Sequence, residues 1–182
     1  MSNKVLIGGI GNVLLGDDAV GPYVIRLLES EYIFPDNVEV VDLGTPALDL
    51  THRMAGLHAV ILVDCVASVD RSSGTVLLYR KDDILRVPPA QRLDPHSPAL
   101  SECLMSAEML GAGPEHVLLV GVVGESLEPG CRMTTAVETA AERAIQAILA
   151  ELARLDVPYE TRRSTLPPAI WWTADAVGVR ES

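Results

Sequence analysis

Residues 4–22 run Lys4-Val-Leu-Ile-Gly-Gly-Ile-Gly-Asn-Val-Leu-Leu-Gly-Asp-Asp-Ala-Val-Gly-Pro22, and they set the architecture expected of this 182-residue chain. An apolar, strand-like run leads into a glycine-rich bend and then into a helix start. Such a bend usually cradles a phosphate. Here it carries two adjacent acids, Asp17 and Asp18, whose charges repel a phosphate and attract a cation. The stretch therefore predicts an α/β protein with a metal, rather than a nucleotide, at its first bend.

Composition limits the class of protein. A chain of 182 residues and 19.5 kDa suits one compact domain, and 48% hydrophobic residues supply a full core. With 14 basic and 25 acidic residues, the net charge is −11. This charge argues against nucleic acid as a partner and favours a cation or a partner with a basic segment.

The cysteines and the apolar runs indicate a cytoplasmic protein without a membrane anchor. Cys65, Cys103 and Cys131 are widely spaced and form no CxxC, which is typical of reduced thiols. The N-terminal run is interrupted by glycines and acids, unlike a signal peptide. The longest apolar runs, Ala59–Val63 and Val117–Val123, are too short to cross a bilayer.

Strands and helices are predicted to alternate along the chain. The expected strands are Val5–Ile10, Val38–Leu43, Ala59–Val63, Thr75–Tyr79 and His116–Val123. The expected helices are Val20–Ser30, Pro46–Met54, one from Ser97–Pro98 to Gly111, and a long last helix ending near Leu155 that starts with a capping box of Thr135 and Glu138. This order predicts a three-layer α/β/α fold, with an open, mostly parallel, twisted sheet of about five strands covered by helices on both faces.

The chain divides into one α/β domain at residues 1–155 and a tail at residues 156–182. Prolines in the tail forbid a long helix, so irregular structure is expected there. The tail holds Trp171 and Trp172, for which docking on the domain's own surface is favoured over contact with a partner.

Ligands of open α/β sheets gather at the carboxyl ends of the strands. The polar residues expected there are Asn12, Asp17, Asp18, Asp42, Asp64 and, in the loop before the third helix, His96. Two carboxylates and an imidazole from three loops form a three-ligand site with open positions. Such a site suits zinc, nickel or manganese, and spacing does not choose among them.

Each candidate also has an ordinary structural interpretation. One acid of the Asp17–Asp18 pair is expected to cap a helix. Asp64 ends a buried strand, where an unpaired carboxylate is costly and needs a partner. Cys65 is predicted to point to the opposite face from Asp64 as a small core residue. The remaining histidines, expected to be surface or boundary residues, are His52, His58 and His116.

A dinucleotide site is the main rival interpretation. Gly9-Ile-Gly11 follows a strand and Asp42 ends the next one, as in a Rossmann fingerprint. The third glycine is missing, because Leu14 takes its place, and the acids lie where a pyrophosphate would bind. The sequence also lacks Gly-x-Ser-x-Gly and HExxH, which argues against a serine hydrolase or a zincin.

Four motifs together resemble the hydrogenase maturation endopeptidases over about residues 4–155. They are Gly11-Asn-Val-Leu-Leu-Gly-Asp-Asp-Ala-Val-Gly21, Val63-Asp64, Asp94-Pro-His96 and Val123-Gly-Glu-Ser-Leu-Glu-Pro-Gly130. The resemblance implies that Asp18, Asp64 and His96 form the metal and catalytic site, with Asp17 as an alternative carboxylate. The family commonly has glycine where this chain has Ala19, and often glutamate at Asp18, which reaches one methylene less far.

The resemblance also implies an activity. These aspartyl-type endopeptidases remove a C-terminal extension from the large-subunit precursor of nickel–iron hydrogenase after nickel insertion, and the nickel carried by the precursor is the recognition signal. A non-catalytic nickel-binding chaperone with the same three ligands is the alternative. Either function makes the precursor the partner, and neither needs nucleic acid or a membrane.

Overall fold

The computed structural model describes residues 3–46, 49–86, 100–130 and 132–172. Its main sheet has five strands in the order β3-β1-β4-β6-β5. These are β1 (Val5–Ile10), β3 (Val38–Gly44), β4 (Ala59–Val66), β5 (Val76–Arg80) and β6 (His116–Val123). The pairs β1–β3, β1–β4 and β4–β6 are parallel, and only β5 pairs antiparallel within this sheet. The predicted mostly parallel sheet is therefore confirmed.

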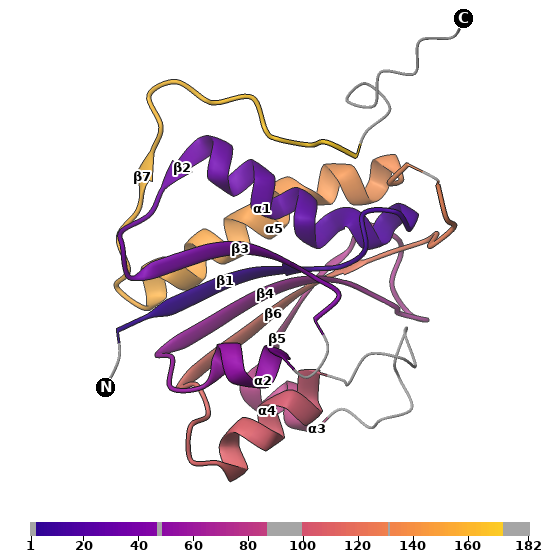
Figure 1. Cartoon of the computed structure of the whole chain (residues 1–182). Helices are drawn as coiled ribbons and strands as arrows, with labels where there is room; N and C mark the ends of the chain where they lie inside the picture. The colour runs from indigo at the N-terminus through magenta and orange to yellow at the C-terminus, as the bar shows by residue number, and fades with distance from the viewer. Residues whose placement is uncertain (1–2, 47–48, 87–99, 131, 173–182) are drawn as a thin grey trace, which may run out of the picture.

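Helices cover both faces of the sheet, as Figure 1 shows. The helices α1 (Val20–Glu31) and α5 (Thr135–Arg154) lie together on one face. The opposite face carries α2 (Asp49–Met54), α3 (Lys81–Arg86) and α4 (Leu100–Met109). The three-layer α/β/α architecture expected from the sequence is confirmed.

The core consists of two apolar clusters, one on each face of the sheet. Successive side chains of a strand point to opposite faces. Ile61 and Val63 accordingly join the cluster under α1 and α5, whereas Val60 and Leu62 join the cluster under α2 and α4. Burial on both faces explains why these strands are nearly continuous apolar runs.

Two glycines let α1 start directly against the sheet. A Cβ added to Gly21 would lie 2.1 Å from the Ile10 carbonyl oxygen and 2.7 Å from that of Val63. A Cβ on Gly9 would lie 2.4 Å from the Gly21 carbonyl oxygen. Larger residues would push α1 off β1 and β4, so these glycines hold the preceding acidic bend at the carboxyl edge of the sheet.

Two predicted helix starts are wrong, because Pro46, expected to open the second helix, is not helical, and the last helix has another N-cap than predicted. The N-cap of α5 is Thr134, whose carbonyl accepts the Glu138 N–H at 2.9 Å, and its side chain makes no capping hydrogen bond. The prediction that Thr135 and Glu138 form a capping box is therefore wrong, since Thr135 is the first helical residue rather than the N-cap. Ser97 and Pro98 lie outside the described residues, and Gly111, with φ of 67°, follows α4 as expected.

A second, two-stranded sheet joins the end of α1 to the tail. In it β2 (Tyr32–Ile33) pairs antiparallel with β7 (Glu160–Thr161). Tyr159 packs edge-on against Tyr32, with ring centroids 5.7 Å apart. The first residues of the tail are thus attached to the domain, whereas only irregular structure was expected beyond Asp156.

One buried carboxylate joins α5 to the strand β5. Glu151 is 3% exposed and accepts hydrogen bonds from Arg80 at 2.6 Å and from Arg154 at 2.8 and 3.0 Å. Burial raises the pKa of Glu151, but the two arginines outweigh it and the pKa lies below its usual value.

Among the described residues, no helix combines the length and the apolar character needed to cross a bilayer.

We predict that Glu151→Gln lowers the free energy of unfolding by about 1–3 kcal/mol at pH 7, because the variant loses the charged partner of two arginines. A lowered folded-state pKa gives stability that is present above the unfolded pKa and is lost as pH falls. The difference between wild type and variant should therefore shrink below about pH 4. Urea unfolding between pH 3 and 7 measures it. Glu142→Gln, at an exposed position of the same helix, should change stability by less than about 0.5 kcal/mol, and an equal loss in both variants would refute the prediction.

Candidate functional site

The acidic bend folds back tightly between β1 and α1. A short 3-10 helix, η1 (Gly16–Ala19), carries both acids and runs directly into α1. Gly11 has φ of 144° and Gly16 has φ of 49°. A Cβ at Gly11 would lie 1.8 Å from the Asp18 carbonyl oxygen, so only glycine allows the chain to fold this closely.

Asp17 is an internal anchor of the bend. Its side chain is fully buried. One oxygen accepts the N–H groups of Glu125 at 2.8 Å and Ser126 at 3.1 Å, and the other accepts the N–H of Thr134 at 2.6 Å. Burial by itself raises the pKa of Asp17, but these backbone hydrogen bonds prevail and the pKa lies below its usual value. Asp17 is thus an ionised carboxylate that holds the loop after β6 and the N-cap of α5.

Asp18 points away from that interior anchor and is partly exposed. Its Oδ2 accepts the Asn12 N–H at 2.7 Å. The side chain of Asn12 in turn accepts the Leu14 N–H at 3.0 Å, which shapes the loop before η1. Neither acid caps a helix through its own side chain, because the caps of η1 and α1 make no such hydrogen bond.

Asp64 lies near the carboxyl end of β4 and comes close to Asp18. Burial raises the pKa of Asp64 well above its usual value, and the negative charge of Asp18 raises it further, while a hydrogen bond from the Cys65 N–H lowers it. Gly121, the residue opposite Asp64 on β6, adds no side chain beside it. Two carboxylates from separate elements therefore converge, and such a pair is stabilised by a shared proton or a cation.

His96, the expected third ligand, lies outside the described residues. The nearest described helix is α4, which begins at Leu100. Because α4 leads to the start of β6 at the amino edge, its own N-terminus lies toward the carboxyl edge. The structure thus brings Asp18 and Asp64 together and leaves the position of His96 as a prediction.

Asp42 and Trp171 lie on the other side of the bend. The Asp42 carboxylate accepts the Gly44 N–H at 2.9 Å and lies 3.7 Å from an Arg26 nitrogen. It lines a pocket of about 280 Å³ together with Gly11, Asn12, Val13, Gly44, Thr45 and Trp171. Trp171 is still 60% exposed, and its ring packs edge-on against Trp172 at 5.7 Å. Trp171 thus touches the domain as one wall of this pocket, and docking of both tryptophans on the domain stays a prediction.

Cys65 has the environment of a core residue rather than of a nucleophile. Its side chain is 6% exposed and belongs to the cluster under α1 and α5. Burial raises the pKa of its thiol far above the usual value, and the nearby charge of Asp64 adds to this rise. The predicted assignment of Cys65 to the core is confirmed.

The loop after β6 is the part of the site whose role the sequence did not reveal. It supplies two N–H groups to Asp17, and its Ser126 carbonyl accepts the Asp17 N–H at 2.9 Å. Leu15 forms a bridge with Pro129. Backbone donors carry no signature of residue type, so the sequence pointed to this loop only through its place after a strand at the carboxyl edge and through the family-like motif Val123–Gly130.

Fold and site together define an α/β protein with paired carboxylates at the carboxyl edge of its sheet. The family model described as HycI hydrogenase maturation protease matches residues 22–151. The chain therefore belongs to the hydrogenase maturation protease family and is a peptidase by class.

Individual relatives agree with this family. The chain is 36% identical over 152 residues to the hydrogenase 2 maturation protease of Escherichia coli K12, covering 82% of this chain and 90% of that protein. It is 34% identical over 172 residues to the hydrogenase expression/formation protein HupM of Azotobacter chroococcum, covering 92% and 82%. The solved structure of the hydrogenase maturating endopeptidase HybD from Escherichia coli superposes with a TM-score of 0.79 at 33% identity, covering 87% of this chain and 98% of that one.

The two adjacent acids should respond differently to the same substitution. We predict that Asp17→Asn lowers the free energy of unfolding by at least about 2 kcal/mol, since an amide has one acceptor oxygen for three buried N–H donors. Asp18→Asn, at a partly exposed position, should change it by less than about 1 kcal/mol. Urea denaturation at pH 7 compares the two variants, and equal losses would show that Asp17 is no anchor.

Proposed function

We propose that this peptidase cuts the C-terminal extension from the large-subunit precursor of a nickel–iron hydrogenase in the cytoplasm, after nickel has entered the precursor. The family and the names of the relatives support hydrogenase maturation as its task. The observation that carries the proposal is the convergence of Asp18 and Asp64 at one edge of the sheet. Two carboxylates whose charges act on each other attract a cation presented by a substrate.

Recognition rests on a shared coordination sphere. In this proposal, Asp18, Asp64 and His96 contact nickel that the precursor already holds, and nickel is therefore part of the substrate. Carboxylates and imidazole together suit a borderline divalent ion. We include His96 as proposed from the sequence, and the start of α4 at Leu100, toward the edge that bears Asp64, supports this choice. A precursor without nickel offers nothing for these ligands to complete, so it is left uncut.

Hydrolysis requires a base near the scissile bond. We assign this role to Asp18, because both oxygens of Asp17 already accept backbone N–H groups and its side chain has no exposed surface. Water adds to the carbonyl carbon while one of its protons passes to the Asp18 carboxylate. The carbon–nitrogen bond then breaks, and that proton goes to the leaving amine. Nickel orients the cleavage segment and polarises the carbonyl.

Two other functions make different demands on the site. A nickel-binding chaperone would use the same carboxylates without hydrolysing any bond. A dinucleotide-binding protein needs Asp42 free for a ribose, whereas here Asp42 holds Gly44 and lies beside Arg26. The chaperone is thus the alternative that an experiment has to separate from the peptidase.

We predict that the wild-type protein shortens a nickel-loaded large-subunit precursor and leaves the nickel-free precursor intact, as measured by mass spectrometry of the large subunit. Asp64→Asn and His96→Ala should each lower the rate by about 100-fold or more. Asp36→Asn, an exposed aspartate before β3, is the charge-matched control and should keep the full rate.

The same measurement separates the alternatives. Complex formation with an unchanged mass would identify a chaperone and overturn the peptidase assignment for this substrate. Full activity of Asp64→Asn would instead remove the proposed nickel contact while leaving the peptidase class in place.

A further inference from the structure

A second group of metal-ligating side chains lies at the amino edge of the sheet, opposite to the edge with Asp18 and Asp64. His58 immediately precedes β4, and Glu115 and His116 stand at the start of β6. One ligand atom from each of these three residues lies within 4.8 Å of the other two. We propose that His58, Glu115 and His116 form a binding site for a divalent transition-metal ion that is separate from the peptidase site.

The backbone fixes the two imidazoles relative to each other. In the parallel register of β4 and β6, Ala59 lies opposite His116. The backbone N–H of His116 donates to the backbone carbonyl of His58 at 3.0 Å, and the backbone N–H of His58 donates to the backbone carbonyl of Lys4 at 3.0 Å. The two rings meet edge to face with centroids 5.1 Å apart. Both ligands are therefore carried by paired strand ends rather than by free loops.

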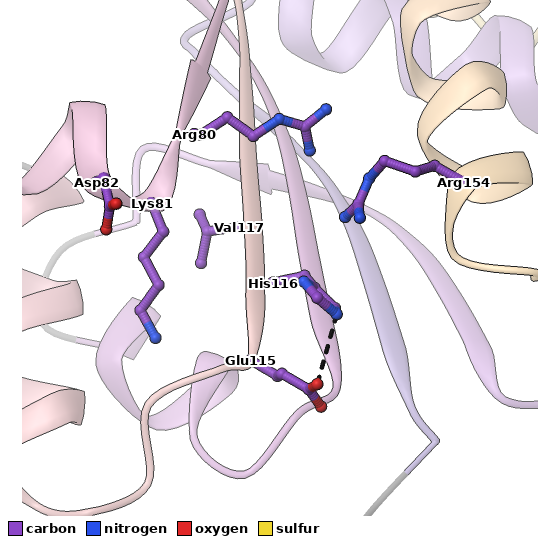
Figure 2. Close-up of a pocket in the computed structure, with 7 residues that line it drawn as sticks. All are labelled: Arg80, Lys81, Asp82, Glu115, His116, Val117 and Arg154. Carbon is purple, nitrogen blue, oxygen red and sulfur yellow. Dashed lines mark ion pairs between the residues drawn. The ribbon is translucent and has the colours of Figure 1, made fainter.

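Glu115 completes the set from the side. Its Oε2 lies 3.0 Å from His58 Nδ1, and its Oε1 lies 3.6 Å from His116 Nε2, the ion pair that Figure 2 draws. Ligand atoms around a tetrahedral zinc ion are roughly 3.3 Å apart. The carboxylate contacts already approach this spacing, and Glu115 is 55% exposed, so its side chain can adjust around an ion.

The donor set selects the class of ion. Two neutral imidazoles and one carboxylate suit zinc, nickel or copper and leave a coordination position open. Glu115 and His116 face an open pocket of about 410 Å³, which is lined by Arg80, Lys81, Asp82, Glu115, His116, Val117 and Arg154. An ion and its water can enter by this opening.

Three basic residues line the same pocket, and each already has an acidic partner. Arg80 and Arg154 both bind Glu151, at 2.6 and 2.8 Å. Lys81 pairs with Glu108 and donates to the Pro114 carbonyl at 2.7 Å. These partners reduce the repulsion of an incoming cation, and the net charge of −11 favours it further.

The test titrates Zn²⁺ into the full ¹⁵N-labelled chain carrying Asp18→Asn and Asp64→Asn, which removes two carboxylates of the other site. Histidine side-chain ¹H–¹⁵N spectra should show the metal shift at Nδ1 of His58 and Nε2 of His116, because these are the nitrogens that face Glu115. The assignment needs no further variant, so a folding defect at the site does not obscure it. Shifts confined to other histidines, or no shift at millimolar Zn²⁺, would overturn the proposal.

Calorimetric titration in the same background supplies the affinity. His58→Gln, His116→Gln and Glu115→Gln should each weaken Zn²⁺ binding at least about tenfold. His52→Gln, at an exposed position of α2, is the matched control and should bind as its parent does. An unchanged affinity in the His58 and His116 variants would show that the ion binds elsewhere.

Discussion

The carboxylate of Asp17 is the interaction on which the carboxyl edge of the molecule depends. It joins three segments that are far apart in sequence, namely the bend after β1, the loop after β6 and the N-cap of α5. A buried charge is tolerated only when its hydrogen-bonding capacity is used, and here backbone N–H groups from Glu125, Ser126 and Thr134 fill it. Because those donors are fixed in the backbone, the anchor orients the bend more firmly than a contact between two flexible side chains would.

This anchor explains why two acids stand side by side. With Asp17 pointing inward, the next residue of the 3-10 turn is turned toward the opening, where Asp18 meets the charge of Asp64. The repulsion between them costs stability, and the inward anchor offsets part of that cost. The Asn12 N–H donates to the Asp18 carboxylate at 2.7 Å. This hydrogen bond fixes the orientation of the short, partly exposed side chain. The short side chain of Asp18 keeps the carboxylate close to its own loop.

Much of the fold could be predicted because its signals are local. The strands β1 and β6 begin and end at the predicted residues, since strands buried on both faces are unbroken apolar runs. Contacts between distant residues were not predictable in the same way. Asp17 and Thr134 are 117 positions apart, and a backbone donor has no residue signature. The sequence alone predicts His58 and His116 as ordinary boundary residues, because only the register of β4 against β6 reveals that they meet.

The register of β4 and β6 serves both edges of the sheet at once. At the amino edge, His58 precedes β4 and His116 begins β6. Toward the carboxyl edge, Asp64 on β4 lies opposite Gly121 on β6. A shift of one residue would turn each of these side chains to the opposite face. It would also expose the apolar faces of both strands, which are packed under helices on either side. The burial of the core therefore fixes the positions of Asp64, His58 and His116 at the two edges, whereas Asp18, which lies outside these strands, depends on the Asp17 anchor.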